Sequence, residues 1–159
     1  RREGIVPLLS IRENMTIPSL KELCKGGFVN VPAEMTLSEE YIQKLAIKTP
    51  STEQAIGNLS GGNQQKVCLA KWLAVKPNVI ILDEPTRGID VGAKAEIHKI
   101  IEQLANDGMA IILISSELPE IMGASDRIIV LYEGEKKAEY IMDESVTQEM
   151  IMQSAAGMY

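Results

Sequence analysis

The sequence is poor in the residues that build metal centres and disulfide frameworks. Its 159 residues include only two cysteines, Cys24 and Cys68, and one histidine. The two thiols do not have the spacing of metal ligands, and two thiols in an acidic chain are typical of a reducing cytoplasm. We therefore expect neither a structural disulfide nor a metal site built from Cys and His.

The chain also lacks a cluster of positive charge and a long apolar run. The chain has 16 Lys and Arg residues and 22 Asp and Glu residues, so its formal charge is −6. This charge argues against a nucleic-acid partner. The longest apolar runs, such as Met109–Ile114, cover about a third of the roughly 20 residues that cross a bilayer. The sequence thus predicts a soluble chain. It starts Arg-Arg-Glu, without an initiator Met or a signal-peptide pattern, so we expect it to be part of a longer protein.

The hydrophobic pattern changes near residue 78. Before this point the chain is mostly helical and rich in loops, with a helix expected over 37–47 that begins at a capping box of Thr36 and Glu39, after a break at Pro32. After it, apolar runs alternate with helical patterns, which favours a parallel sheet with crossover helices. The expected strands are 79–82, 110–114, 128–132 and 136–141, and the expected helices are 93–105, 118–122 and one from about 146.

Polar side chains follow two of the expected strands. Asp83 and Glu84 come directly after the apolar run Val79–Leu82, and Ser116 follows the next run. Ligands of open parallel sheets bind beyond the carboxyl ends of the strands. Asp83 is a candidate Mg²⁺ ligand, because hard cations prefer carboxylate oxygens, and Glu84 is a candidate base for an attacking water. Two solvated acids at a strand end are the alternative, which the branched run and the following Pro85 disfavour.

The segment Leu59–Lys66 reads Leu-Ser-Gly-Gly-Asn-Gln-Gln-Lys. Ser60 is placed to cap a helix that starts at Gly61, and helix N-termini carry free N–H groups and a partial positive charge. The two glycines let the backbone approach a phosphate, so we interpret the segment as an anion site rather than a plain N-cap. Behind it, Val67, Ala70, Leu73 and Ala74 form a core stripe, and Cys68 and Trp72 are expected to pack.

Three segments of the chain, Leu59–Lys66, Asp83–Lys94 and Ile114–Glu120, resemble the ATP-binding subunits of ABC transporters. The resemblance is strongest to the second, C-terminal cassette of bacterial importers of ribose, xylose or galactose. It implies an α/β fold, the C-terminal part of a P-loop (RecA-like) nucleotide-binding domain with a parallel sheet and crossover helices. It also implies a helical subdomain over residues 1–76, which includes the signature motif and its helix, followed by the C-terminal half of the core over residues 77–159.

The resemblance also implies roles for individual residues. Asp83 is the Mg²⁺ ligand and Glu84 the catalytic carboxylate of the Walker B strand. Ser116 occupies the position where most such ATPases have a switch histidine, and a serine cannot become cationic near neutral pH. The residues expected to contact ATP are those of the signature motif and one D-loop acid: Leu59, Ser60, Gly61, Gly62, Asn63, Gln64 and Asp90.

ABC cassettes pair head to tail, so Ser60, Gly61 and Gly62 are expected to serve an ATP held by another cassette, whereas Asp83 and Glu84 serve the ATP of their own. No Gly-x-x-x-x-Gly-Lys-Ser/Thr phosphate loop occurs in the 159 residues. We therefore expect the isolated chain neither to bind ATP tightly nor to hydrolyse it. In the parent protein, the competent site is expected to be the one that Ser60 and Gly62 complete.

The implied function is ATP hydrolysis that drives monosaccharide import, carried out by a peripheral subunit on the cytoplasmic face of the inner membrane. The implied partners are a second cassette, a sugar permease and, indirectly, a periplasmic sugar-binding protein. Two alternatives stay open at this point. One is a soluble ABC ATPase of translation or DNA repair, and the other is a non-catalytic assembly module that donates the signature helix.

Overall fold

The computed structural model describes residues 4–158, which form two compact units. The first unit comprises the described residues up to 80 together with residues 85–111, and the second comprises residues 81–84 and the described residues from 112 onward. Within the described range, no helix is long and apolar enough to cross a membrane.

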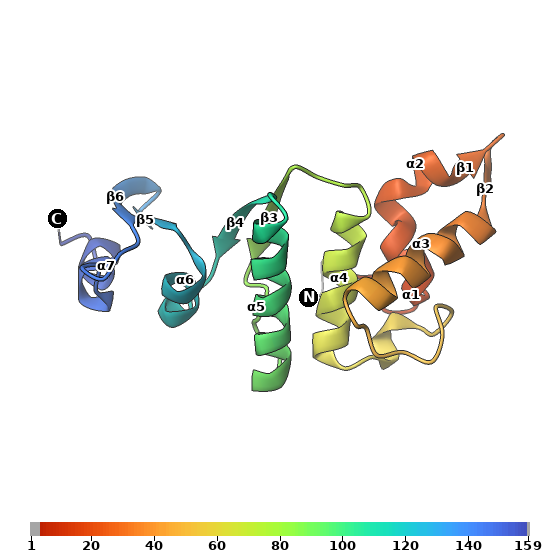
Figure 1. Cartoon of the computed structure of the whole chain (residues 1–159), viewed down its shortest axis with the longest axis horizontal. Helices are drawn as coiled ribbons and strands as arrows, with labels where there is room; N and C mark the ends of the chain where they lie inside the picture. The colour runs from red at the N-terminus through yellow and green to blue at the C-terminus, as the bar shows by residue number, and fades with distance from the viewer. Residues whose placement is uncertain (1–3, 159) are drawn as a thin grey trace. The chain divides into compact units, whose positions relative to one another are not determined.

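Helix α4 (Gly61–Leu73) organises the first unit (Figure 1), because it packs against α1 (Ile11–Thr16), α3 (Val31–Lys44) and α5 (Val91–Asn106). Its buried apolar residues include Val67, Leu69, Ala70 and Leu73. This confirms the predicted stripe on the helix that follows Ser60. The remaining elements of the unit are η1 (Ile17–Ser19), α2 (Leu20–Leu23), β1 (Cys24–Lys25), β2 (Phe28–Val29) and η2 (Ile56–Asn58).

Helix α3 begins six residues before the predicted start at 37. Asn30 caps the helix by accepting a hydrogen bond from the N–H of Ala33. Pro32 lies in the first turn, where its missing N–H costs nothing, so it does not separate two segments. Thr36 lies inside the helix and donates its hydroxyl to the carbonyl of Pro32. The predicted capping box of Thr36 and Glu39 is therefore wrong.

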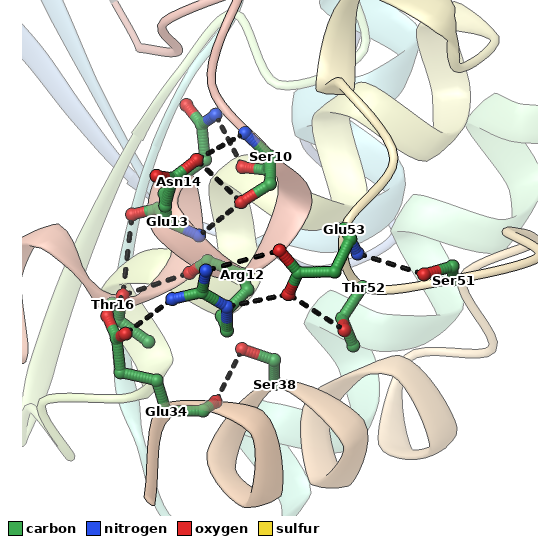
Figure 2. Close-up of polar contacts among 10 residues, drawn as sticks. All are labelled: Ser10, Arg12, Glu13, Asn14, Thr16, Glu34, Ser38, Ser51, Thr52 and Glu53. Carbon is green, nitrogen blue, oxygen red and sulfur yellow. Dashed lines mark hydrogen bonds and ion pairs between the residues drawn. The ribbon is translucent and has the colours of Figure 1, made fainter. Parts of the chain in front are cut away.

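A polar network joins α1 to α3 and to the loop before η2 (Figure 2). The Arg12 guanidinium contacts Glu34 at 2.5 Å and Glu53 at 2.7 Å, and the Thr16 hydroxyl donates to the second oxygen of Glu34 at 2.6 Å. The Glu34 side chain is only 3% exposed, whereas that of Glu53 is 54% exposed. Both oxygens of the buried carboxylate are thus bonded, which is the condition under which a buried charge is tolerated.

Ser10 and Glu13 form a capping box at the start of α1. The Glu13 N–H donates to the Ser10 hydroxyl oxygen, while the Ser10 hydroxyl and N–H donate to the Glu13 carboxylate, each at 2.7 Å (Figure 2). These bonds, the one from the hydroxyl first, hold the pKa of Glu13 below its usual range.

Strands β3 (Val79–Asp83) and β4 (Ala110–Ile114) form a two-stranded sheet. At its start the Ala110 N–H donates to the carbonyl of Asn78, and at its end the Glu84 N–H donates to the carbonyl of Ile114. The beginning of β3 thus lies beside the beginning of β4, and the two ends also lie side by side. The two strands are therefore parallel, as predicted. The carboxyl ends of both strands therefore lie at one edge of the sheet.

Strands β5 (Arg127–Tyr132) and β6 (Glu135–Ile141) form an antiparallel hairpin, and α6 (Leu118–Ala124) and α7 (Gln148–Ala155) complete the second unit. The core here centres on Ile128, Val130 and Ile151. We expected residues 128–132 in the parallel sheet. They pair with β6 and not with β3 or β4. The sequence also predicts a turn at Glu133 and Gly134 into the strand over 136–141, and this is confirmed, because both residues have positive φ and close a two-residue hairpin turn.

Removal of Glu34 should destabilise the fold more than removal of Glu53, although both carboxylates pair with Arg12. We expect Glu34→Ala to lower the free energy of unfolding by about 3 kcal/mol, because it leaves a mostly buried guanidinium without its buried partner. Glu53→Ala should cost about 1 kcal/mol or less, because an exposed pair is weak. Urea unfolding of the two variants checks this, and equal losses would contradict the buried network.

Acid should weaken the first unit partly through Glu13. Because the pKa of Glu13 is lowered by folding, its contribution to stability is present above its unfolded pKa of about 4.5 and is lost as the pH falls through the lower folded value. Glu13→Gln should therefore make the unfolding free energy fall less between neutral and acid pH. Ser10→Ala should flatten the same profile, because it removes the donating hydroxyl. Wild-type profiles in both variants would show that the capping box does not lower this pKa.

Candidate functional site

The N-terminus of α4 presents an exposed serine on a buried helix. Ser60 is the N-cap, and its hydroxyl oxygen accepts from the N–H of Asn63 at 3.5 Å and from the side-chain amide of Asn63 at 2.9 Å. Two acceptor bonds occupy both lone pairs of a hydroxyl, so its proton is available to an outside acceptor. Ser60 itself is exposed. This confirms the predicted cap and leaves an O–H donor beside the free N–H groups of the first helical turn.

The other polar residues of the segment bond within the chain. The Asn63 side-chain oxygen accepts from the N–H of Lys48 at 2.8 Å, and the Gln64 side-chain amide donates to the carbonyl of Leu59 at 2.9 Å. Leu59 is buried, with 9% exposure. These contacts hold the turn before Ser60 from both sides. The role of Lys48 had no signal in the sequence, because a backbone N–H can come from any residue.

Gly62 lies where α4 meets the start of α5. A Cβ built on Gly62 would lie 2.5 Å from the Cβ of Ala93, well inside the 3.5–4.0 Å at which carbons make favourable contact. Asp90 caps α5, and its carboxylate accepts from the N–H of Ala93 at 2.9 Å. The structure thus brings Gly62, Ala93 and Asp90 together within the first unit.

Lys66 connects the same two helices one turn further along. Its ammonium contacts Glu96 at 2.8 Å and donates to the carbonyl of Ala46 at 3.1 Å, and its side chain is only 4% exposed. The hydrogen bond from Lys66 and its charge lower the pKa of Glu96. The sequence suggested no role for Lys66 other than as the last residue of the segment Leu59–Lys66. Its partners, Ala46 and Glu96, are 20 and 30 positions away, so no local pattern could indicate them.

Glu84 follows β3 in the left-handed region, with φ of 47°. A non-glycine residue held there is strained, and such residues cluster at functional sites. Its carboxylate accepts a hydrogen bond at 2.9 Å from the N–H of Ser116, which follows β4. The two residues predicted at the ends of neighbouring strands therefore meet within the second unit, through the backbone N–H of Ser116.

Asp83 ends β3 with an exposed side chain. Among the residues with described positions, no three His, Cys, Asp or Glu side chains gather into a cage that could hold a metal alone. Mg²⁺ does not need such a cage, since it is commonly held by one or two carboxylates together with substrate phosphates and water. The exposed carboxylate of Asp83 fits that kind of site.

The neighbouring Ser115 is engaged elsewhere. Its hydroxyl bonds the carboxylate of Glu120 and accepts from the N–H of Glu117, so it fastens the start of α6. Of the two adjacent serines, only Ser116 reaches Glu84.

Comparison with known proteins identifies the family. The family model described as "ABC transporter" matches residues 2–87, more than half of the chain. The chain belongs to the ABC transporter family. It is 54% identical to the xylose import ATP-binding protein XylG of Histophilus somni, covering 98% of this chain and 31% of that protein. It is 49% identical to the ribose import ATP-binding protein RbsA of a Jannaschia species, covering 98% of this chain and 30% of that protein. The chain thus spans about a third of the length of these relatives.

Solved structures agree with the predicted fold class. A dimeric, post-hydrolysis ATP-binding cassette bound to ADP and Pi matches 87% of this chain and 59% of its own, with a TM-score of 0.72 and 26% identity. A second dimeric cassette of a bacterial ABC transporter matches 90% of this chain and 61% of its own, with a TM-score of 0.73 and 25% identity. The α/β cassette fold and the resemblance to sugar-import ATP-binding proteins are therefore confirmed. The roles of the individual site residues stay predictions.

The Asn63 side chain bonds both Lys48 and Ser60, so it stabilises the segment Leu59–Lys66. We expect Asn63→Ala to lower the free energy of unfolding by about 1–2 kcal/mol, because it removes the acceptor for Lys48 and a bond to Ser60. Urea unfolding measures the loss, and the matched control is Gln65→Ala on the same helix, which should change stability by less than about 0.5 kcal/mol. Similar changes in both variants would show that the side-chain bonds of Asn63 do not stabilise the fold.

Proposed function

We propose that this chain is part of an ATP-hydrolysing cassette that powers the import of a monosaccharide. The observation that carries the proposal is the folded form of Leu59–Lys66, a capped and exposed helix start whose serine hydroxyl is free to donate. The direction of transport and the sugar class come from the relatives, whose names describe import of xylose, ribose or galactose.

Ser60, Gly61 and Gly62 bind the γ-phosphate of an ATP held by another cassette. The Ser60 O–H and the first N–H groups of α4 are donors without helical partners, and a helix N-terminus attracts anions. Leu59, Asn63 and Gln64 contribute by holding this donor set, since the contacts of all three lie inside the chain. Asp90 acts as the D-loop acid from the cap of α5.

Glu84 accepts the proton of the water that attacks the γ-phosphate of the ATP bound by this cassette. The Ser116 N–H holds the carboxylate in place and leaves its second oxygen for that water. Asp83 holds Mg²⁺, which neutralises charge on the phosphates. Ser116 cannot supply the positive charge of a histidine, so we propose that this site turns over more slowly than the one Ser60 completes.

The partners follow from the same assignment. The helical subdomain, residues 1–76, contacts a sugar permease at the cytoplasmic face of the membrane, and residues 77–159 belong to the nucleotide-binding core. A second cassette supplies the phosphate loop that faces Ser60. A periplasmic sugar-binding protein binds the permease and affects this chain only through it. The names of the relatives support transport rather than a soluble ATPase of translation or DNA repair.

A chimera tests the proposal. Residues 1–159 replace the matching segment of the xylose import ATP-binding protein of Histophilus somni, and Mg²⁺-dependent ATPase activity is measured. Ser60→Arg should lower kcat by about 10²-fold or more, because it removes the hydroxyl that caps α4 and places a long side chain where the phosphate would bind. Glu84→Gln should leave a substantial share of turnover, because it disables only the slower site.

Ser145→Arg, the same change at an exposed position outside the motifs, is the control and should leave kcat within about twofold, as surface changes usually do. An unchanged kcat in Ser60→Arg together with a lost kcat in Glu84→Gln would contradict the assignment of the competent site. A chimera with no ATPase activity before any substitution would contradict the proposed function itself.

A further inference from the structure

The glycine at position 62 has a packing partner within its own chain. We propose that Gly62 and Ala93 form a matched pair that sets the separation between the start of α4 and the Asp90 cap of α5. In this pair Ala93 is a positioning residue, which acts on the exposed donors of α4 and on Asp90 without contacting a nucleotide.

The contact is close and leaves no room for a second methyl. A Cβ on Gly62 would meet the Cβ of Ala93 at 2.5 Å and its Cα at 3.8 Å. The first of these separations is one that real Cβ atoms do not show, and neither atom is the movable end of a flexible side chain. An alanine at 62 must therefore push α4 and the start of α5 apart.

The pair is linked directly to Asp90. The Asp90 carboxylate accepts from the N–H of Ala93, and the Asp90 carbonyl accepts from the N–H of Lys94. A displacement of Ala93 therefore moves the Asp90 cap with it. One turn along each helix, the ion pair of Lys66 and Glu96 closes the same interface, and the Lys66 ammonium is additionally fixed on the carbonyl of Ala46.

A glycine beside a phosphate can also serve only to let the ligand approach the backbone. A glycine that serves only the approach of a ligand has free space around its missing side chain. In that case Gly62→Ala would stabilise the helix, because glycine is the poorer helix former. The direction of the stability change therefore distinguishes the two explanations without any nucleotide.

The test is a thermal unfolding cycle on the 159-residue chain. Gly62→Ala should lower Tm in the native background. In the Ala93→Gly background, where the opposing methyl is absent, the same Gly62→Ala change should raise Tm by roughly 1–4 °C through helix propensity. The control is Gly123→Ala on α6, where a Cβ meets nothing within 4 Å, and it should raise Tm in both backgrounds.

The reversal of sign is the decisive result. A lower Tm in both backgrounds would show that Ala93 is not the neighbour that excludes a side chain at 62, and a higher Tm in both would show that nothing excludes it. Either outcome overturns the proposal. If Gly62→Ala does not fold, folding of the double variant supports the pair, and failure of both variants overturns it.

The consequence for catalysis rests on the proposed function and has its own measurement. In the chimera, Gly62→Ala should lower kcat, and Ala93→Gly should restore at least half of it in the double variant. A reversed Tm without restored kcat would overturn the positioning role of Ala93. Loss of ATPase activity in the chimera before substitution concerns only the proposed function, since the unfolding cycle contains no nucleotide.

Discussion

Burial of one face of α4 is the interaction on which the first unit depends. The apolar stripe behind the motif fills the space between α1, α3 and α5, and the Tyr41 hydroxyl donates to the carbonyl of Leu73 at the far end of the helix. Burial raises the pKa of Tyr41, which keeps this hydroxyl a donor. Because the body of α4 is held in this way, the exposed Ser60 is presented by a rigid helix and not by a mobile loop.

The two parts of the proposed chemistry rely on different physical devices. In the proposed function, the partial positive charge and the unpaired donors at the start of α4 attract a phosphate, while the side-chain amides of Asn63 and Gln64 hold the turn before it. After β3, a strained residue in the left-handed region directs the Glu84 carboxylate onto the N–H of Ser116. In the proposed function, the first device binds an anion and the second orients a base.

Local patterns in the sequence predicted the elements that depend on local causes. Strand β4 and the cap and stripe of α4 were predicted because each signal lies within a few residues. The start of α3 was missed because Pro32 reads equally as a break or as a first-turn residue. Trp72, expected to pack, is 49% exposed and lies beside the Lys71 ammonium. The contacts of Gly62 with Ala93 and of Arg12 with Glu34 join distant positions, which no local pattern encodes.

We propose that the motifs of this chain act on ATP only beside a phosphate loop that another segment supplies. Equilibrium titration of the purified 159-residue chain with a fluorescent ATP analogue and Mg²⁺ tests it most directly, with Glu84→Gln measured in parallel to suppress turnover. We expect no saturable binding up to millimolar nucleotide, because a helix start and one hydroxyl do not replace the glycine-rich cradle and its lysine. Saturable binding at micromolar nucleotide would instead show that a complete nucleotide site lies within these residues and that no outside phosphate loop is needed.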